Sequence, residues 1–115
     1  MHSIEIHAGF ADAARARLDT MGLGGNVRIE AADAFSWDTD RRYDAICVTG
    51  AVDTIPPRFL RWLRPGGRLF VVRGVAPAME AVLVRNDVNG PGIESLFETD
   101  LNYLAGAAPV AKFDF

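Results

Sequence analysis

The stretch that decides the fold is His2-Ser3-Ile4-Glu5-Ile6, followed at once by the segment Ala8–Met21. The first stretch alternates and is rich in β-branched residues, which predicts a strand that brings Glu5 to its end. The second stretch predicts an amphipathic helix, because its apolar residues recur at helical spacing. These residues are Phe10, Ala14, Leu18 and Met21. A strand, an acid and a helix in this order are what nucleotide-binding α/β sheets use to hold a ribose.

The glycine-rich segment Gly22-Leu23-Gly24-Gly25-Asn26 is interpreted as the end of that helix. It follows a helix and precedes a strand that we expect at Val27–Ala31. A phosphate-binding loop has the opposite order, in which the glycines follow a strand and open a helix. The segment is therefore predicted to cap the helix C-terminus.

The rest of the chain predicts more strands than helices. Further strands are expected at Tyr43–Thr49, Arg68–Arg73, Glu80–Asn86 and Ile93–Tyr103. The run Tyr43–Thr49 is apolar enough for a parallel strand buried on both faces, with Cys47 inside it. The segment Gly74–Met79 is too short for a crossover helix, so the strands on either side of it are expected to be antiparallel neighbours.

Shorter features complete the predicted order of elements. A helical turn and loop are expected over Ala34–Arg42, and a helix opens at Pro56-Pro57. That helix has Phe59, Leu60 and Leu63 on its apolar face and ends at Arg64-Pro65-Gly66-Gly67. Asn89–Gly92 predicts a turn, and the apolar tail Val110–Phe115 is expected to pack onto the fold. The fold class is α/β, with a mostly parallel sheet and an antiparallel closing strand pair, in one domain over residues 1–115.

Composition narrows the classes of function. Half of the residues are hydrophobic, 23% are charged, and the net charge is −3, which is typical of a globular protein. We expect no nucleic-acid partner because the Lys and Arg residues form no cluster. No membrane association is expected, since no stretch has the length of a membrane span and no signal peptide opens the chain. The single cysteine fits a reducing, cytoplasmic location, and no spacing of metal ligands is found.

Several short motifs occur together in a recognisable order. They are Ser3-Ile4-Glu5, Asn26-Val27 with Ala32-Asp33-Ala34, Tyr43-Asp44-Ala45-Ile46 with Val48-Thr49, Ile55-Pro56, and Leu63-Arg64-Pro65-Gly66-Gly67-Arg68-Leu69. As an ordered set they resemble S-adenosylmethionine-dependent methyltransferases, most closely the protein-L-isoaspartate O-methyltransferase family. The resemblance covers nearly all of the chain and corresponds to roughly the second half of a family member. It implies a Rossmann-like sheet, S-adenosylmethionine as cofactor, and methyl transfer to an isoaspartyl carboxylate of a damaged protein or peptide.

The resemblance also implies which residues bind the cofactor. Glu5 matches the acid that accepts hydrogen bonds from the ribose hydroxyls, and Ile6 matches an apolar position that packs on the adenine. Asp33, with Ala34, matches the motif that contacts the adenine. The alternative for Glu5 is a solvated acid at a strand end. The alternative for Asp33 is a helix N-cap or a turn residue.

On the acceptor side, the resemblance implies that Thr49–Pro56 is a loop after a strand, with Thr49, Gly50 and Ala51 lining the substrate. The chain keeps the small residues of that loop but not the family's proline and acid, since Val52, Asp53 and Thr54 follow. Val72-Arg73 also departs from the Pro-Val pair that is typical before Gly74. These departures bear on the acceptor more than on the cofactor.

One part of the family pattern has no counterpart in these 115 residues. The glycine-rich loop that holds the methionine end of the cofactor, and the sheet strand before it, are not in the sequence. In the family that strand lies between the strands that end here at Glu5 and Thr49. We therefore expect a truncated domain with two unpaired strand edges. Either these strands pair directly, or another chain fills the gap and self-association follows, or the chain is unstable alone.

No residue is assigned to the chemical step, because transfer from an activated sulfonium depends mainly on orientation. The isolated chain is expected to have negligible activity. Three functions stay open: an isoaspartyl methyltransferase, a methyltransferase with another acceptor, and a non-catalytic fragment or interaction module with the same fold. A nicotinamide-binding half is disfavoured by the antiparallel closing pair and by Pro65-Gly66-Gly67.

Overall fold

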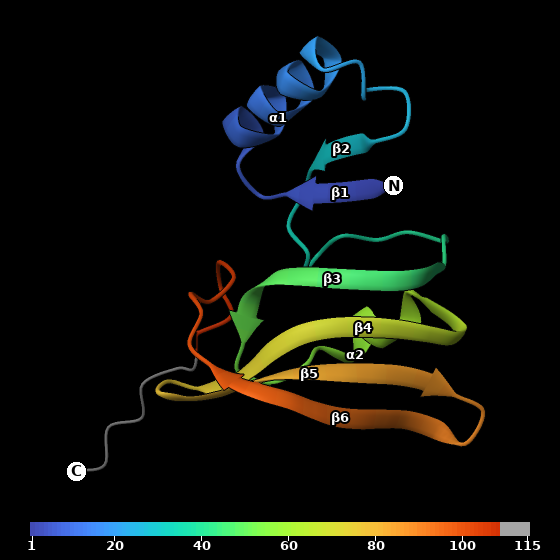
Figure 1. Cartoon of the computed structure of the whole chain (residues 1–115), viewed down its shortest axis with the longest axis vertical. Coiled ribbons are helices and arrows are strands. Elements are labelled where there is room, and N and C mark those ends of the chain that lie inside the picture. Colours follow the sequence, from blue (N-terminus) through green and yellow to red (C-terminus); the bar gives the residue numbers. More distant parts are fainter. Residues whose placement is uncertain (109–115) are drawn as a thin grey trace. The chain divides into compact units, whose positions relative to one another are not determined.

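The computed structural model describes residues 1–108 and contains two compact units, Met1–Thr39 and Asp40–Phe115. The expected packing of Val110–Phe115 lies outside the described residues. Along the chain the elements follow the order β1, α1, β2, β3, α2, β4, β5 and β6 (Figure 1). This order confirms the predicted succession of strands and helices, and the segment after β2 forms a turn and loop, as expected.

The first unit is a β-α-β motif. Strand β1, His2–Glu5, pairs in parallel with β2, Arg28–Ala31, and helix α1, Ala8–Thr20, connects them (Figure 1). The register sets Glu5 opposite Ala31. These bounds differ by one residue from the predicted ones. They confirm the interpretation of the opening stretch.

Helix α1 ends in the way that the glycine segment predicted. Gly22 has a positive φ of 73°, and its N–H donates to the carbonyl of Asp19 at 3.2 Å. The N–H of Leu23 donates to the carbonyl of Leu18 at 2.8 Å. These two bonds form a Schellman motif, in which a residue without a Cβ adopts the left-handed conformation at no steric cost.

The buried stripe of α1 is narrower than expected. Ala11 is fully buried, while Ala14 and Leu18 are half-buried. Phe10 and Met21, predicted for the same face, are 66% and 68% exposed. The helix packs on the two strands of its own unit, and a two-stranded surface covers the central line of a helix but not its flanks.

The second unit is a four-stranded sheet in the order β3-β4-β5-β6. Its strands are β3, Tyr43–Val52, β4, Leu63–Val75, β5, Ala78–Asp87, and β6, Gly90–Thr99. Strands β3 and β4 are parallel, and β4–β5 and β5–β6 are antiparallel (Figure 1). A mixed sheet with an antiparallel closing pair was predicted and is confirmed.

Strand β3 is less buried than its apolar sequence suggested. Asp44, Ala45, Cys47 and Thr49 are exposed, so the prediction that Cys47 is buried was wrong. The cause is position in the sheet. β3 lies at the edge of its sheet, and the short helix of this unit, α2, Pro57–Arg61, packs on β4. The apolar sequence of β3 therefore does not correspond to a strand that is covered on both faces.

The core of this unit lies on the two faces of β4 and β5. Leu69 and Val71 alternate with Phe70 and Val72, and the antiparallel register sets Val84 and Val82 opposite the first pair. Leu69, Val71, Val82 and Val84 are buried on one face. On the other face, Val72, Met79, Ala81 and Ala51 form a cluster on which Phe70 and Tyr103 pack.

Helix α2 is shorter than predicted, because the chain enters the sheet early. Tyr43 N donates to Trp62 O at 2.7 Å, and Leu63 already pairs with Tyr43. Leu63 is therefore a buried strand residue and does not belong to the helix face. Residues 64–67 loop out of the ladder before it resumes at Arg68, opposite Ala45.

The last hairpin and strand also differ in their limits. The β5–β6 ladder continues to Asp87 opposite Gly90, so the turn is residues 88–89 and not 89–92. Strand β6 ends at Thr99, well before the predicted Tyr103. Tyr103 instead forms a parallel bridge with Ala51, whose N–H donates to Asn102 O at 2.9 Å. Strand β6 ends at Thr99 because its partner there, Met79, lies next to the start of β5 at Ala78.

Candidate functional site

Two carboxylates lie at one edge of the first unit. Glu5 ends β1, and Asp33 follows β2 by two residues. The two strands are parallel and in register, and Ala32 N donates to Glu5 O at 2.9 Å. Both acids therefore belong to the carboxyl edge of the β-α-β motif, where α/β proteins bind their ligands.

The carboxylate of Glu5 is held by its own turn. Its Oε1 accepts a hydrogen bond from the backbone N–H of His7 at 3.2 Å. Its Oε2 accepts none from residues 1–108. The side chain is half-buried, and the Ile6 side chain beside it is 43% exposed. An acceptor oxygen with an exposed apolar neighbour is suited to a sugar hydroxyl next to a flat ring.

Asp33 closes a turn, as its alternative interpretation proposed. Oδ1 accepts from Phe35 N at 2.9 Å, and the carbonyl accepts from Trp37 N at 2.7 Å. Ala34, inside this turn, is half-buried. The turn occupies one carboxylate oxygen of Asp33, and Oδ2 accepts no hydrogen bond from the described residues. A turn role and a ligand contact are thus compatible at this residue.

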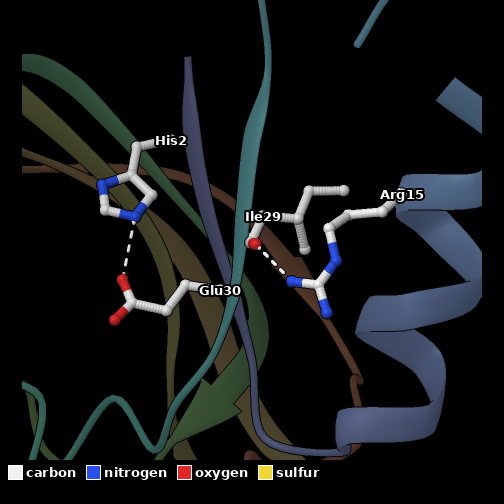
Figure 2. Close-up of polar contacts among 4 residues, drawn as sticks. All are labelled: His2, Arg15, Ile29 and Glu30. Atoms are coloured by element: carbon white, nitrogen blue, oxygen red, sulfur yellow. Dashed lines mark hydrogen bonds and ion pairs between the residues drawn. The ribbon is translucent and has the colours of Figure 1, made fainter. Parts of the chain in front are cut away.

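Polar contacts connect β1, β2 and α1, the elements that carry or precede these acids (Figure 2). His2 Nε2 lies 3.1 Å from Glu30 Oε2 across the two strands, and Arg15 Nη1 donates to Ile29 O at 2.7 Å. The His2 ring also contacts Trp37 edge-on, with 5.2 Å between the ring centroids. Sequence reasoning gave His2 no role. The signal was its place in the strand, one register step from Ile29 and two from Glu30.

The residues expected in the acceptor loop are in strand β3 instead. Thr49, Gly50 and Ala51 belong to Tyr43–Val52, and the loop begins at Asp53, so their placement in a loop was wrong. Gly50 and Ala51 are buried. A Cβ on Gly50 would lie 2.6 Å from Leu104 Cδ2. These residues are small because the chain after β6 packs on them.

The second unit has a surface hollow of about 710 Å³ at the carboxyl ends of β3 and β4. A loop after β3, the β4–β5 hairpin and one residue of β6 contribute to it. Its lining residues are Asp53, Thr54, Ile55, Arg73, Gly74, Pro77, Ala78, Met79, Glu80 and Glu98. Only the loop after β3 and Arg73-Gly74 had been connected with the acceptor side from the sequence.

The pKa of Glu80, a residue of this hollow, is lowered by its hydrogen-bond partners. Ser95 Oγ donates to its Oε2 at 2.8 Å, and Arg73 Nη2 donates to its Oε1 at 3.2 Å. These bonds, first that of Ser95 and then that of Arg73, lower the pKa of Glu80 below its usual value of 4.5, against a smaller effect of burial. Glu80 is therefore ionised at neutral pH.

Two further searches concern metals and membranes. Among residues 1–108, no three His, Cys, Asp or Glu side chains are grouped closely enough to hold a metal ion. No helix in the same part of the chain has the length and hydrophobicity needed to cross a membrane.

The β-α-β motif with acids at its carboxyl edge, followed by a sheet with an antiparallel closing pair, defines a Rossmann-like fold of the methyltransferase class. The model of the family described as protein-L-isoaspartate(D-aspartate) O-methyltransferase matches residues 1–98. The chain belongs to this family.

Curated relatives agree with that assignment. Protein-L-isoaspartate O-methyltransferase 2 of Syntrophobacter fumaroxidans is 37% identical over 92 residues, which are 78% of this chain and 37% of the relative. Protein-L-isoaspartate O-methyltransferase 1 of an Anaeromyxobacter species is 39% identical over 101 residues, which are 86% of this chain and 46% of the relative. The chain thus spans less than half the length of these relatives.

Solved structures of similar fold carry the same name. One, from Plasmodium falciparum and in complex with S-adenosyl-L-homocysteine, has a TM-score of 0.79 at 14% identity and covers 90% of this chain and 51% of that one. Another protein-L-isoaspartate O-methyltransferase has a TM-score of 0.80 at 23% identity, with coverage of 92% and 34%. At these identities the likeness concerns the fold alone.

Proposed function

We propose that this chain is part of an S-adenosylmethionine-dependent methyltransferase whose methyl acceptor is the carboxylate of an isoaspartyl residue in a damaged protein. The observation that carries the proposal is the joint position of Glu5 and Asp33 at one carboxyl edge in a member of this family. The chain supplies the residues for the nucleoside half of the cofactor and a hollow for part of the acceptor.

The residues present fit a nucleoside. Glu5 Oε2 would accept a hydrogen bond from a ribose hydroxyl while Oε1 keeps its bond from His7 N, so the carboxylate would not have to leave its turn. Ile6 offers an exposed apolar surface to the adenine. Asp33 Oδ2 would accept from the adenine amino group, with Ala34 next to it in the chain. When bound, S-adenosylmethionine supplies a methyl group already activated by its sulfonium.

The residues of this chain then act by position. Carboxylates fixed by backbone N–H groups lose little freedom when a ligand binds, so they orient the nucleoside at small entropic cost. The acceptor peptide lies against the second unit, along the loop that begins at Asp53. No acid–base group of the chain is required to activate a carboxylate that is already ionised at neutral pH.

Association and location follow from the same proposal. In the described part of the chain, β1 pairs only with β2, and β3 has a single ladder partner, β4. Unpaired strand edges invite other strands, so these 115 residues by themselves self-associate and turn over little substrate. The acceptor proteins and the single cysteine favour a cytoplasmic location.

Titration calorimetry with S-adenosylhomocysteine tests the cofactor assignment. We expect binding by the chain, with affinity reduced about tenfold or more in Glu5→Gln, because hydrogen bonds to a charged group contribute about 1.5–3 kcal/mol. Asp12→Asn is the matched control, since Asp12 is exposed on α1 and pairs with Arg15 of the same helix. Equal affinity of Glu5→Gln and the parent chain would contradict the assignment. The acceptor is tested with a fusion of this chain to the N-terminal half of a family member, using two peptides that differ only in carrying glutamate or isoaspartate. Methylation of the glutamate peptide but not of the isoaspartyl peptide would contradict an isoaspartyl acceptor.

A further inference from the structure

The hollow of the second unit has a lining of two kinds. Ile55, Pro77 and Met79 are apolar, and Met79 is almost fully buried at 3% exposure. Around them stand three carboxylates and one guanidinium, which give a net charge of −2 when all are ionised. A volume of about 710 Å³ is within the range of ligand sites. An apolar wall with anionic groups above it complements a long side chain that ends in a cation.

The charged side chains of the hollow differ in whether other residues already bind them. Glu80 is engaged at both oxygens, by Arg73 and by Ser95. Glu80 therefore has no unpaired oxygen left for a ligand. Asp53 uses Oδ1 for its own loop, accepting from Thr54 N at 2.7 Å, and Glu98 is exposed on β6. The two carboxylates left for a ligand are those of Asp53 and Glu98.

The register of β5 and β6 makes one of these carboxylates unfavourable without a ligand. Glu98 lies directly opposite Glu80 across the antiparallel pair. Like charges in this position destabilise a sheet, and Arg73 offsets only one of them. A cation placed beside Glu98 removes the remaining repulsion. The free energy of binding a cationic group is therefore more favourable in this hollow than it would be in an uncharged cleft of the same shape.

We propose that this hollow selects methyl acceptors by charge, taking a Lys or Arg side chain next to the residue to be methylated. The inference rests on the proposed function and deepens it. The position of the hollow supports it, because the carboxyl ends of parallel strands are where ligands of α/β proteins bind. Asp53 and Arg73, which shape it, stand where the chain departs from the pattern of the similar family.

Four fluorescein-labelled hexapeptides test the proposal by anisotropy with the full chain. They contain isoaspartate or aspartate, each followed one residue later by Lys or by Glu. We expect the isoaspartyl-Lys peptide to bind about three- to tenfold more tightly than the isoaspartyl-Glu peptide, since two exposed charge pairs contribute modestly. The preference should shrink as NaCl screens it. Asp53→Asn with Glu98→Gln should abolish it.

The control variant is Glu94→Gln on the same strand. Glu94 lies opposite Leu83, on the other face of the sheet from Glu98, and pairs with Arg85 at 3.8 Å. It should keep the full preference for Lys. No preference, a preference unchanged in the double variant, or no binding of any peptide by a chain that binds S-adenosylhomocysteine would overturn the inference. A Lys preference combined with equal affinity for the isoaspartyl-Lys and aspartyl-Lys peptides would support the hollow and contradict the isoaspartyl acceptor.

Discussion

The hydroxyl group of Tyr103 donates to the carbonyl of Gly74 at 2.8 Å and accepts from the N–H of Ala76 at 3.2 Å. One side chain thus fastens the segment after β6 to the β4–β5 hairpin, 29 residues away in the chain. Gly74 is also part of the hollow wall. The shape of the hollow therefore depends on a residue that does not line it.

Tyr103→Phe should lower the free energy of unfolding by about 1 kcal/mol, the usual contribution of a hydrogen bond, because two backbone groups lose their partner. The ring keeps its packing on the Ala51 cluster, so no cavity forms. Urea unfolding followed by circular dichroism measures the change. A midpoint equal to that of the parent chain would show that water replaces the hydroxyl at no cost.

Gly74→Ala should be the most damaging of the alanine substitutions at glycines with a positive φ. Gly74 has φ 129°, and a Cβ there would overlap the backbone of Ala78 and Met79. Gly66, with φ 79° and open space around it, should lose only about 1 kcal/mol on the same change. Gly25→Ala, with neither constraint, should be neutral or stabilising. Thermal unfolding ranks the three variants, and a different order would contradict the steric argument.

The acidity of Glu80 predicts a pH dependence of stability. A carboxyl whose pKa is lowered by folding contributes stability above its unfolded pKa of about 4.5, and the contribution is lost as the pH falls through the folded pKa. Ser95→Ala removes the largest cause of the lowered pKa. The difference in Tm between the parent chain and Ser95→Ala should be present at neutral pH and shrink in acid. In a Glu80→Gln background this pH dependence should disappear, and its persistence there would point to another group.

Asp33 has a role in a turn and a proposed role in binding the cofactor, and variants can separate the two. Asp33→Asn keeps a carbonyl oxygen for Phe35 N but removes the charge, whereas Asp33→Ala also removes the turn contact. We expect both to weaken S-adenosylhomocysteine binding, and only Asp33→Ala to lower stability, by about 0.5–2 kcal/mol. Calorimetry and thermal unfolding measure the two effects. Unchanged affinity in Asp33→Asn would leave Asp33 as a turn residue only.

Local patterns predicted the scaffold well. Alternation and helical spacing predicted every strand and both helices, although β4 begins five residues before the predicted Arg68 and β6 ends four residues before the predicted Tyr103. Gly22 was identified as a helix terminator from the order of elements around it. The resemblance placed Glu5 and Asp33 near one another, and the parallel register of β1 and β2 puts both at one edge. These features depend on short segments and their immediate neighbours.

Contacts distant in sequence account for what was missed. The exposure of Cys47 depends on the place of β3 at the edge of its sheet. The extension of β3 to Val52 depends on the chain returning at residues 102–104 to supply a backbone partner. The pairing of Glu80 with Ser95 and Arg73 depends on the register of three strands. None of these relations leaves a periodic signal in the sequence.

The position of Cys47 has a practical consequence. It is the only thiol of the chain, it is exposed, and it lies on the strand whose outer side has no ladder partner in the described residues. A maleimide dye attached there needs no engineered attachment point. Its emission would report when another polypeptide docks along that strand, so mixing experiments can be followed in real time.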